Sequence, residues 1–338
     1  MKALCVSTPH TIIIEERPKP SIHASTEVLI KVKAAGICGS DIHIYHGTSP
    51  VATYPRVIGH EVVGEVIEIG NDVTLFSLGD RVIMDPVISC GNCYQCKIGR
   101  RNVCGKLKVR GVHVDGGYQE YIVVPQESIY HLPADISWEE AIMIEPFTIA
   151  EQVCSRAELT KNDIVFIMGA GPVGLSILKM AKLYGATCYI SDVFDYKLKQ
   201  AALYGADVII NANEVDVLDK IMNLTEGNGA NVVIDAVCST KSFEQTLTYV
   251  CAAGRVIALG FNKEFSAISQ LSITAREIDI RGSRLHNNKF PAVIEHFISG
   301  KLEVKDMITH RFPFTEIHDA IKLIENPAIE NGKVVLLF

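Results

Sequence analysis

Six short apolar segments alternate with stretches of helical periodicity between residues 164 and 281 of this 338-residue chain. Apolar strands that alternate with helices are typical of βαβ units, whose strands lie parallel in one sheet. The pattern therefore predicts an α/β fold, a doubly wound sheet of six parallel strands. The predicted strands are Ile164–Met168, Thr187–Ser191, Asp207–Ile210, Val232–Asp235, Arg255–Leu259 and Glu277–Arg281.

The first of these strands leads into a glycine-rich turn with the spacing G-x-G-x-x-G. Glycine permits the tight turn and lets the backbone approach a pyrophosphate, which then lies at the N-terminus of the next helix. A glycine-rich turn in a Rossmann-like domain that binds something else, or nothing, is the alternative. The helix is expected to begin near Val173. The predicted dinucleotide-binding residues of the turn are Gly169, Gly171, Pro172, Val173 and Gly174.

An acidic residue, Asp192, closes the second predicted strand. It follows the last glycine of the turn, Gly174, by eighteen residues. A carboxylate at this distance can accept hydrogen bonds from an adenosine ribose and would repel a 2′-phosphate, which favours NAD over NADP. Lys197 lies five residues further on and weakens that exclusion, although its position also suits a solvated helix face. We expect NAD to be the cofactor, with NADP as the lesser candidate.

The residues before this sheet contain short β-segments punctuated by glycine, which predicts a β-rich domain whose loops carry chemistry. Beyond the sheet, the sequence predicts a helix over 290–299 and a final strand over 333–338 that returns to the first domain. The expected division is a catalytic domain over 1–147, a dinucleotide-binding domain over 148–285 and a returning segment over 286–338. The β-segments are Val28–Lys33, Val62–Ile69, Arg81–Met84 and Tyr118–Val124.

Four cysteines lie within fifteen residues: Cys90, Cys93, Cys96 and Cys104. Four reduced thiolates in one loop would repel one another unless a cation lay among them, and Zn²⁺ takes tetrahedral sulfur coordination. An iron–sulfur cluster is the alternative, but such runs usually continue with a three-residue gap and proline. Unligated cysteines are the third reading. The spacing favours a structural zinc site.

A second set of metal-binding residue types is spread along the first domain: Cys38, His60 with Glu61, and Glu145. One thiolate, one imidazole and one or two carboxylates can form an open zinc site, which must keep a position for water or substrate. Taken singly, a cysteine is more often a small buried apolar residue and a histidine a satisfied polar one. These residues become candidate zinc ligands because the same chain also contains the cysteine loop and the glycine-rich turn.

Composition limits the partners. The net charge is −7, and lysine and arginine are scattered, which argues against a nucleic-acid partner. The N-terminus enters strand-like alternation at once, and no long uncharged apolar window follows. We therefore expect a cytoplasmic protein with a small-molecule substrate and no membrane partner.

Together and in this order, the three groups of residues resemble the zinc-containing medium-chain dehydrogenase/reductase family over essentially the whole chain. The resemblance implies a GroES-like first domain, a Rossmann second domain, one catalytic and one structural zinc, and a homo-oligomer, dimer or tetramer. Cys38, His60 and Glu61 match the catalytic-zinc positions of the family. Glu145 matches the carboxylate that replaces a cysteine in the polyol dehydrogenase branch. Whether Glu61 and Glu145 bind zinc together stays open.

Residues 55–61, 111–117, 144–147 and 283–285 look like the bacterial group that contains L-galactonate and L-gulonate 5-dehydrogenases and starvation-sensing dehydrogenase-like proteins. The resemblance implies a sugar-acid substrate, with polyol or L-threonine dehydrogenases as alternatives. Arg284 and His113 could bind the substrate carboxylate, and Tyr45 could line the site. Arg284 could instead meet the cofactor or an interdomain carboxylate, and His113 and Tyr45 could be structural or surface residues.

The same resemblance implies a mechanism. Zinc would lower the pKa of a substrate hydroxyl. Ser40 could hydrogen-bond that oxygen, and its proton would pass through the nicotinamide ribose to His43. Hydride would leave for a nicotinamide ring beside Val173. Ser40 as a turn cap and His43 as a surface residue are the plainer readings, and a dinucleotide-binding regulatory protein is the alternative without catalysis.

Overall fold

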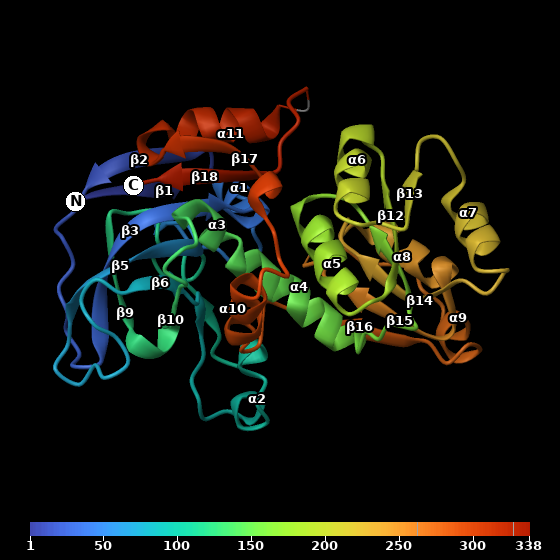
Figure 1. Ribbon diagram of the computed structural model, residues 1–338, viewed down its shortest axis with the longest axis horizontal. Helices are drawn as coiled ribbons and strands as arrows, with labels where there is room; N and C mark the ends of the chain where they lie inside the picture. The colour runs from blue at the N-terminus through green and yellow to red at the C-terminus, as the bar shows by residue number, and fades with distance from the viewer. Residues whose placement is uncertain (262, 327) are drawn as a thin grey trace. The chain divides into compact units, whose positions relative to one another are not determined.

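The computed structural model describes residues 1–261, 263–326 and 328–338 and divides the chain into two compact units. Unit 1 comprises Met1–Pro146 and Phe290–Phe338, and unit 2 comprises Phe147–Lys289. These divisions follow residues 146 and 289, where the sequence predicted ends at 147 and 285. In Figure 1 the red C-terminal segment lies with the blue N-terminal strands of unit 1.

Among the described residues, a seven-stranded sheet forms the centre of unit 1. Its long strand β3 (Glu27–Ile37) pairs antiparallel with β5 (Glu61–Ile69), β9 (Tyr121–Pro125) and β18 (Lys333–Leu337). The pairing of β18 with β3 confirms that the last strand returns to the first domain. The other strands are β6 (Arg81–Met84) and β10 (Ile129–His131) beyond β5, and β17 (Ile308–Pro313) beyond β18.

Smaller elements surround this sheet. Strands β1 and β2 form an antiparallel hairpin that β4 joins, and β7 pairs with β8. The strands are β1 (Lys2–Thr8), β2 (Thr11–Glu16), β4 (Arg56–Val57), β7 (Val87–Ile88) and β8 (Lys108–Val109). The helices are α1 (Gly39–Tyr45), α2 (Tyr94–Lys97), α3 (Trp138–Ile142), α10 (Phe290–Ile298) and α11 (Ile317–Glu325), with 3₁₀ turns at 101–103, 126–128, 305–307 and 314–316.

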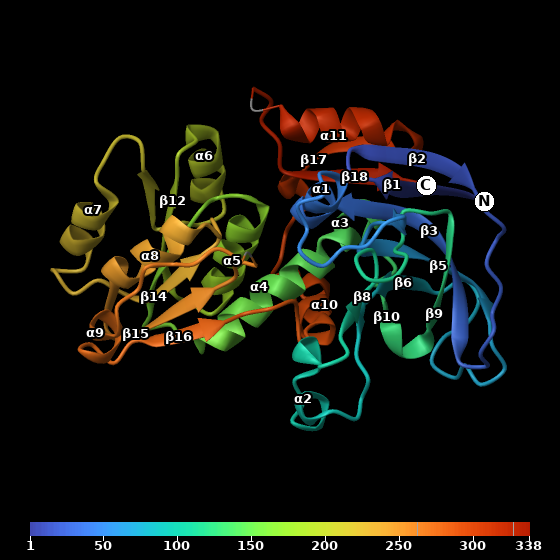
Figure 2. The same cartoon turned by 180° about the vertical axis from the view of Figure 1, so that it is seen from behind.

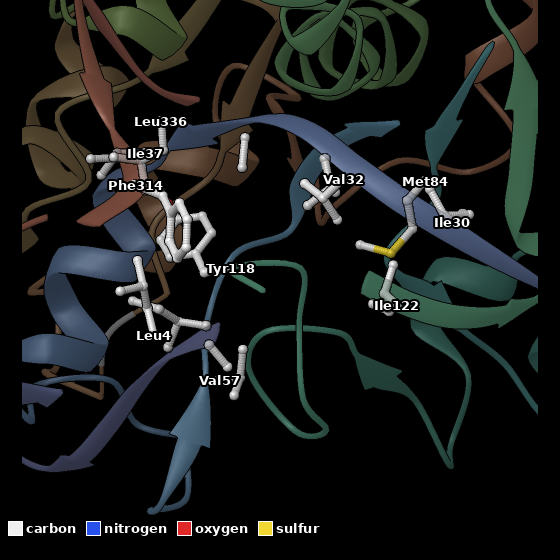
Figure 3. Close-up of a cluster of buried hydrophobic side chains, with 14 of the residues drawn as sticks. Leu4, Ile30, Val32, Ile37, Val57, Met84, Tyr118, Ile122, Phe314 and Leu336 are labelled. Carbon is white, nitrogen blue, oxygen red and sulfur yellow. The ribbon is translucent and has the colours of Figure 1, made fainter. Parts of the chain in front are cut away.

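Strand β3 contributes buried side chains to the core of unit 1. Ile30 and Val32 are almost fully buried, whereas Lys31 between them is exposed, which is the alternation of a strand with one face on a core. Figure 3 shows Ile30 near Met84 of β6 and Ile122 of β9. Replacing a buried isoleucine of this kind by alanine costs about 2–5 kcal/mol. This packing holds the strand ends that carry the candidate metal ligands.

Unit 2 has, in the part of the chain that the structure describes, a six-stranded parallel sheet of strand order β13-β12-β11-β14-β15-β16. The order reverses between β11 and β14, and ligands bind at this switch point in open sheets of this kind. The predicted doubly wound sheet is confirmed. The strands are β11 (Ile164–Met168), β12 (Thr187–Asp192), β13 (Val208–Asn211), β14 (Ala230–Asp235), β15 (Val250–Ala258) and β16 (Asp279–Gly282).

Most strands differ from their predicted bounds by a few residues, and two begin three or more residues from their predicted starts. Strand β15 begins at Val250 rather than Arg255, because Val250 pairs with Ala230 across a register shift in β14. Strand β9 begins at Tyr121 rather than Tyr118, because the N–H of Tyr118 bonds to Ile58 instead.

Helices cover this sheet. Helix α5 packs against β11 and β12, and Figure 2 shows α8 over β14 and β15, which it contacts. Helix α4 (Ile144–Ala157) contains the boundary between the units. None of the helices among the described residues is long and apolar enough to cross a membrane. The remaining helices are α5 (Pro172–Leu183), α6 (Asp195–Leu203), α7 (Val217–Leu224), α8 (Thr240–Tyr249) and α9 (Gln270–Thr274).

Candidate functional site

Three predicted ligands meet where β3 ends and β5 begins. Cys38 caps the N-terminus of α1 directly after β3, and His60 and Glu61 lie at the start of β5. One ligand atom from each of the three lies within 4.8 Å of the others. His60 and Glu61 are buried, and Cys38 is partly exposed. A thiolate, an imidazole and a carboxylate in this arrangement have the chemistry of an open zinc site, and the residues therefore fit this metal.

Asp41 lies on the Nδ1 side of the His60 ring. Its carboxylate is buried, lies 3.5 Å from Nδ1 of His60, and accepts a hydrogen bond of 3.0 Å from the backbone N–H of Cys38. The hydroxyl of Tyr118 lies 3.0 Å from the same carboxylate. Burial alone would lower the pKa of His60, but the charges of Asp41 and Cys38 raise it well above its usual value. A carboxylate at Nδ1 fixes the imidazole so that Nε2 can face a metal.

Lys333 holds Glu61 in the same way. Its Nζ lies 2.7 Å from both carboxylate oxygens of Glu61, and both side chains are buried. Burial alone would lower the pKa of Lys333, but the negative charge of Glu61 raises it above its usual value. Gly36 makes room for this pair, because a Cβ there would lie 2.0 Å from Oε2 of Glu61. Glu61 is therefore a carboxylate whose charge is already balanced within the protein.

The other predicted residues of this region fall on α1 and α4. Ser40 lies in the first turn of α1, with its Oγ 3.5 Å from Nε2 of His60. His43 lies on an exposed part of α1, and its Nδ1 is 3.0 Å from Oγ1 of Thr48. Glu145 is the second residue of α4, is buried, and contributes to the electrostatics of Lys333. It is outside the group of three ligand atoms described above.

The four cysteines of the lobe converge as the spacing predicts. Sγ of Cys93 lies 3.4 Å from that of Cys96 and 3.7 Å from that of Cys104, and Cys104 lies 3.4 Å from Cys90. These separations exceed a disulfide bond and are close to the ~3.8 Å between sulfurs around a tetrahedral zinc with Zn–S bonds of about 2.3 Å. The donor set fits zinc.

Backbone N–H groups favour the thiolate form of Cys93. Hydrogen bonds from the backbone of Cys96 and Gly105 lower the pKa of Cys93 to about 6, whereas burial and the neighbouring cysteines raise the pKa of Cys96 to about 11. The backbone N–H groups of Cys90 and Lys106 each lie 3.3 Å from Sγ of Cys104. Oriented N–H dipoles of this kind stabilise the charged form of sulfur, which is the form that binds metal.

The glycine-rich turn joins β11 to α5. Gly169 has a φ of +96°, and a Cβ on Gly174 would lie 1.9 Å from the carbonyl oxygen of Gly169. Gly171 is the N-cap of α5 and Pro172 its first residue, one position before the predicted start. A side chain at Gly174 would collide with that carbonyl oxygen and force the turn open. The turn therefore presents the backbone at the N-terminus of α5, as a pyrophosphate site requires.

Asp192 ends β12 beside this turn. Its Oδ2 accepts a hydrogen bond of 2.8 Å from the N–H of Ala170, and its Oδ1 accepts bonds from Val193 and Phe194 at 2.8 and 3.1 Å. These bonds fix the carboxylate at the carboxyl edge of the sheet. Lys197 lies on α6 with its Nζ 4.8 Å from the centre of the Phe194 ring, an attractive cation–π contact.

The three predicted substrate residues lie in different places. Tyr45 ends α1, with its ring in edge contact with that of His46. Nδ1 of His113 accepts a hydrogen bond of 3.1 Å from the N–H of Val109. Arg284 belongs to unit 2 and stacks its guanidinium 4.7 Å from the centre of the Phe261 ring.

Sequence reasoning missed two residues of the site. Asp41 had a signal, since its place three residues after the N-cap is that of a capping-box acid. Lys333 had a weaker one, a lysine at the head of an otherwise apolar strand. Its partner Glu61 is 272 residues away in sequence, so only the fold brings the two together.

Two family models match the chain. Residues 24–134 match the alcohol dehydrogenase GroES-like domain, and residues 172–299 match the zinc-binding dehydrogenase domain. The starvation-sensing protein RspB of Escherichia coli K12 is 42% identical, with 100% of this chain and 99% of that protein covered. A sorbitol dehydrogenase of Bacillus subtilis is 34% identical, with 95% and 93% covered. The L-galactonate-5-dehydrogenase of E. coli K12 is 33% identical, with 99% and 97% covered.

A solved structure agrees with these relatives. The alcohol dehydrogenase rspB from E. coli CFT073, crystallised in complex with NADH, has a TM-score of 0.95 at 42% identity, with 100% of this chain and 99% of that chain covered. Similarity at this level extends over the whole chain. The chain therefore belongs to the zinc-containing medium-chain dehydrogenase/reductase family of oxidoreductases.

Proposed function

We propose that the protein is an NAD-dependent zinc dehydrogenase that oxidises a secondary hydroxyl of a six-carbon sugar acid, of the L-gulonate or L-galactonate type, at the 5-position. The observation that carries the zinc chemistry is the convergence of Cys38, His60 and Glu61, with the Ser40 hydroxyl beside His60. The acidic sugar class rests on the similarity to L-galactonate-5-dehydrogenase.

The catalytic site is assigned residue by residue. Cys38 and His60 would hold the catalytic zinc, with Glu61 or Glu145 as the carboxylate ligand. When bound, zinc supplies a Lewis acid that lowers the pKa of a coordinated hydroxyl, and NAD supplies the hydride acceptor. Ser40 would hydrogen-bond the reacting oxygen and accept its proton while giving up its own to the relay that ends at His43, and His43 would release a proton to solvent.

Lys333 has a supporting role in this assignment. Because it neutralises Glu61, that carboxylate would add little net negative charge to the zinc site. A less negative ligand set leaves the metal a stronger Lewis acid. The second zinc would be held by Cys90, Cys93, Cys96 and Cys104 and would stabilise the fold of the lobe.

The cofactor assignment rests on Asp192. Its carboxylate is fixed beside the glycine-rich turn by three backbone N–H groups, so it is oriented to accept hydrogen bonds from a ribose and to repel a phosphate. Gly169, Gly171, Pro172, Val173 and Gly174 would cradle the pyrophosphate and the nicotinamide end. Lys197, held over Phe194, would lie at the rim.

The substrate carboxylate needs a cationic partner, and we assign it to Arg284, with His113 and Tyr45 as the further expected contacts. A guanidinium binds a carboxylate through two parallel hydrogen bonds, which lysine reproduces poorly. The Arg284→Lys variant should therefore raise KM for the acid and spare any activity on a neutral polyol. Equal losses on both substrates would instead assign Arg284 to the cofactor.

The test of the proposal is NADH formation at 340 nm with a panel of hexonates, polyols and L-threonine, with NAD and with NADP. Turnover of L-gulonate or L-galactonate above the others supports the sugar-acid assignment. Turnover of sorbitol or L-threonine with no hexonate oxidised contradicts it. The sorbitol reading has its own support, the similarity to the Bacillus subtilis sorbitol dehydrogenase.

A regulatory protein that binds a dinucleotide is the second class of function, favoured by the similarity to RspB, which is named for starvation sensing. The complete set of metal, relay and cofactor residue types favours turnover over binding alone. Binding of NADH with no turnover of any substrate in the panel, in protein loaded with zinc, would support the regulatory reading.

We also propose a cytoplasmic homodimer, or a tetramer built from it. The ten cysteines, all within the described residues, form no disulfide, as expected in a reducing compartment.

The proposed interface between copies is strand β16. This strand is an edge of the unit 2 sheet, and Ile280 is 37% exposed on it. In antiparallel pairing of two copies about Ile280, Asp279 would face Arg281. Light scattering should give a mass at least twice that of one chain. The Ile280→Lys variant should give a lower mass.

A further inference from the structure

Helix α1 ends in a turn that carries Thr48 back beside His43. The N–H of Thr48 donates to the carbonyl of His43 at 2.9 Å, and the N–H of Gly47 donates to the carbonyl of Ile44 at 3.1 Å. This pair of bonds defines a Schellman motif, in which Gly47 takes the left-handed position at a φ of +75°. The motif places the side chain after the glycine against the side chain one turn earlier, usually as an apolar contact.

In this chain the contact is polar. Oγ1 of Thr48 lies 3.0 Å from Nδ1 of His43 and 3.3 Å from the carbonyl oxygen of His43. Two arrangements of hydrogens are compatible with these distances. Either Nδ1–H donates to the hydroxyl, which donates to the carbonyl, or the hydroxyl donates to an unprotonated Nδ1.

The first arrangement serves both protonation states of the ring. A doubly protonated imidazole must donate from Nδ1, so Thr48 must then act as an acceptor and send its own hydrogen to the carbonyl. If the neutral ring uses the same arrangement, a proton can arrive at Nε2 and leave it while the hydroxyl stays in place. In the second arrangement the hydroxyl would have to rotate each time that His43 gained or lost a proton.

We propose that Thr48 is a positioning residue for His43, which fixes the neutral ring as the Nδ1–H tautomer and leaves Nε2 as the atom that exchanges protons. This inference rests on the proposed function, in which His43 is the outer member of the proton relay. The Schellman motif orients the threonine, so the relay geometry is determined by the end of α1 and by Gly47. A Cβ on Gly47 would lie 2.8 Å from Pro9, so glycine is required there for space as well as for φ.

Nitrogen NMR tests the tautomer without any need for turnover. Long-range ¹H–¹⁵N correlation on protein with ¹⁵N-labelled histidine separates protonated from unprotonated ring nitrogens, and the His43→Gln variant assigns the signals of His43. At a pH where that ring is neutral, we expect Nδ1 to be protonated and Nε2 unprotonated. Thr48→Val keeps the branched shape and removes the acceptor, so His43 should move to the Nε2–H tautomer. Thr48→Ser should keep the original state.

Kinetics test the role in the reaction. In the zinc- and NAD-dependent oxidation of the best substrate of the panel, Thr48→Val should lower kcat about two- to tenfold, the range expected for one neutral hydrogen bond, with KM unchanged. Thr48→Ser should restore kcat. Ser49→Ala, which changes the next hydroxyl along the chain, is the matched control and should leave kcat as it is.

The outcomes separate this proposal from the proposed function. An Nε2–H tautomer in the unmodified protein, or an unchanged tautomer in Thr48→Val, overturns the assignment to Thr48. A changed tautomer with unchanged kcat overturns the role of Thr48 in the relay. Absence of turnover on every substrate contradicts the proposed function, and the NMR result then still decides whether Thr48 sets the tautomer.

Discussion

Removing one side of the ion pair between Lys333 and Glu61 should destabilise unit 1 by several kcal/mol, because both side chains are buried with 5% and 1% exposure. Lys333→Met would leave the Glu61 carboxylate in the interior without its counter-ion. Removing one partner of a buried pair costs about 3–5 kcal/mol, chiefly through the charge that stays behind. The double variant with Glu61→Gln removes that charge as well and should recover about 1–3 kcal/mol of the summed single losses.

The assay uses the single tryptophan of the chain. Trp138 lies on α3 in unit 1, the unit that contains the ion pair, so its fluorescence during urea unfolding reports on the right part of the molecule. The control is Lys322→Met, which breaks the pair with Asp319 at 76% and 64% exposure. An exposed pair contributes at most about 1 kcal/mol. Equal losses for Lys333→Met and Lys322→Met, or strictly additive losses in the double variant, would refute the reasoning.

Other predictions concern the metals, the cofactor and the core. Elemental analysis should find about two zinc ions per chain. Cys93→Ser should unfold the cysteine lobe, detected by proteolysis, whereas Cys38→Ser should abolish turnover and keep the circular dichroism spectrum; equal structural loss would contradict two distinct sites. NAD should exceed NADP at least about tenfold in kcat/KM, and Asp192→Ala should erode that ratio. Tyr118→Phe removes a buried hydroxyl 3.0 Å from Asp41 and should lower the free energy of unfolding by about 1–3 kcal/mol; an unchanged urea midpoint would exclude that contribution.

Local sequence patterns were enough to predict much of the architecture. The alternation of apolar strands and helices predicted the parallel sheet of unit 2, because period and turn signals are properties of neighbouring residues. The glycine-rich turn followed for the same reason, since its close approach involves Gly169 and Gly174 within one turn. The four cysteines also lie within one short segment, so their spacing was enough to predict that their sulfurs meet.

The second metal-type site was only partly open to this reasoning. The sequence indicated Cys38, His60 and Glu61 as a set, but the distance between them depends on how β3 pairs with β5. Glu145 entered through a resemblance, and its burial near Lys333 became visible only in the fold.

By itself, the sequence determined which residue types are available for metal, dinucleotide and proton transfer, and the local elements that present them. Tertiary structure decided which charges are compensated. Lys333 reaches Glu61 across 272 residues because β18 pairs with β3, and Tyr118 reaches Asp41 across 77 residues. Buried charges must find partners wherever the chain brings them, and that need leaves no periodic pattern in the sequence. The electrostatics of the site is therefore a property of strand pairing, whereas its chemistry is already present in the residues.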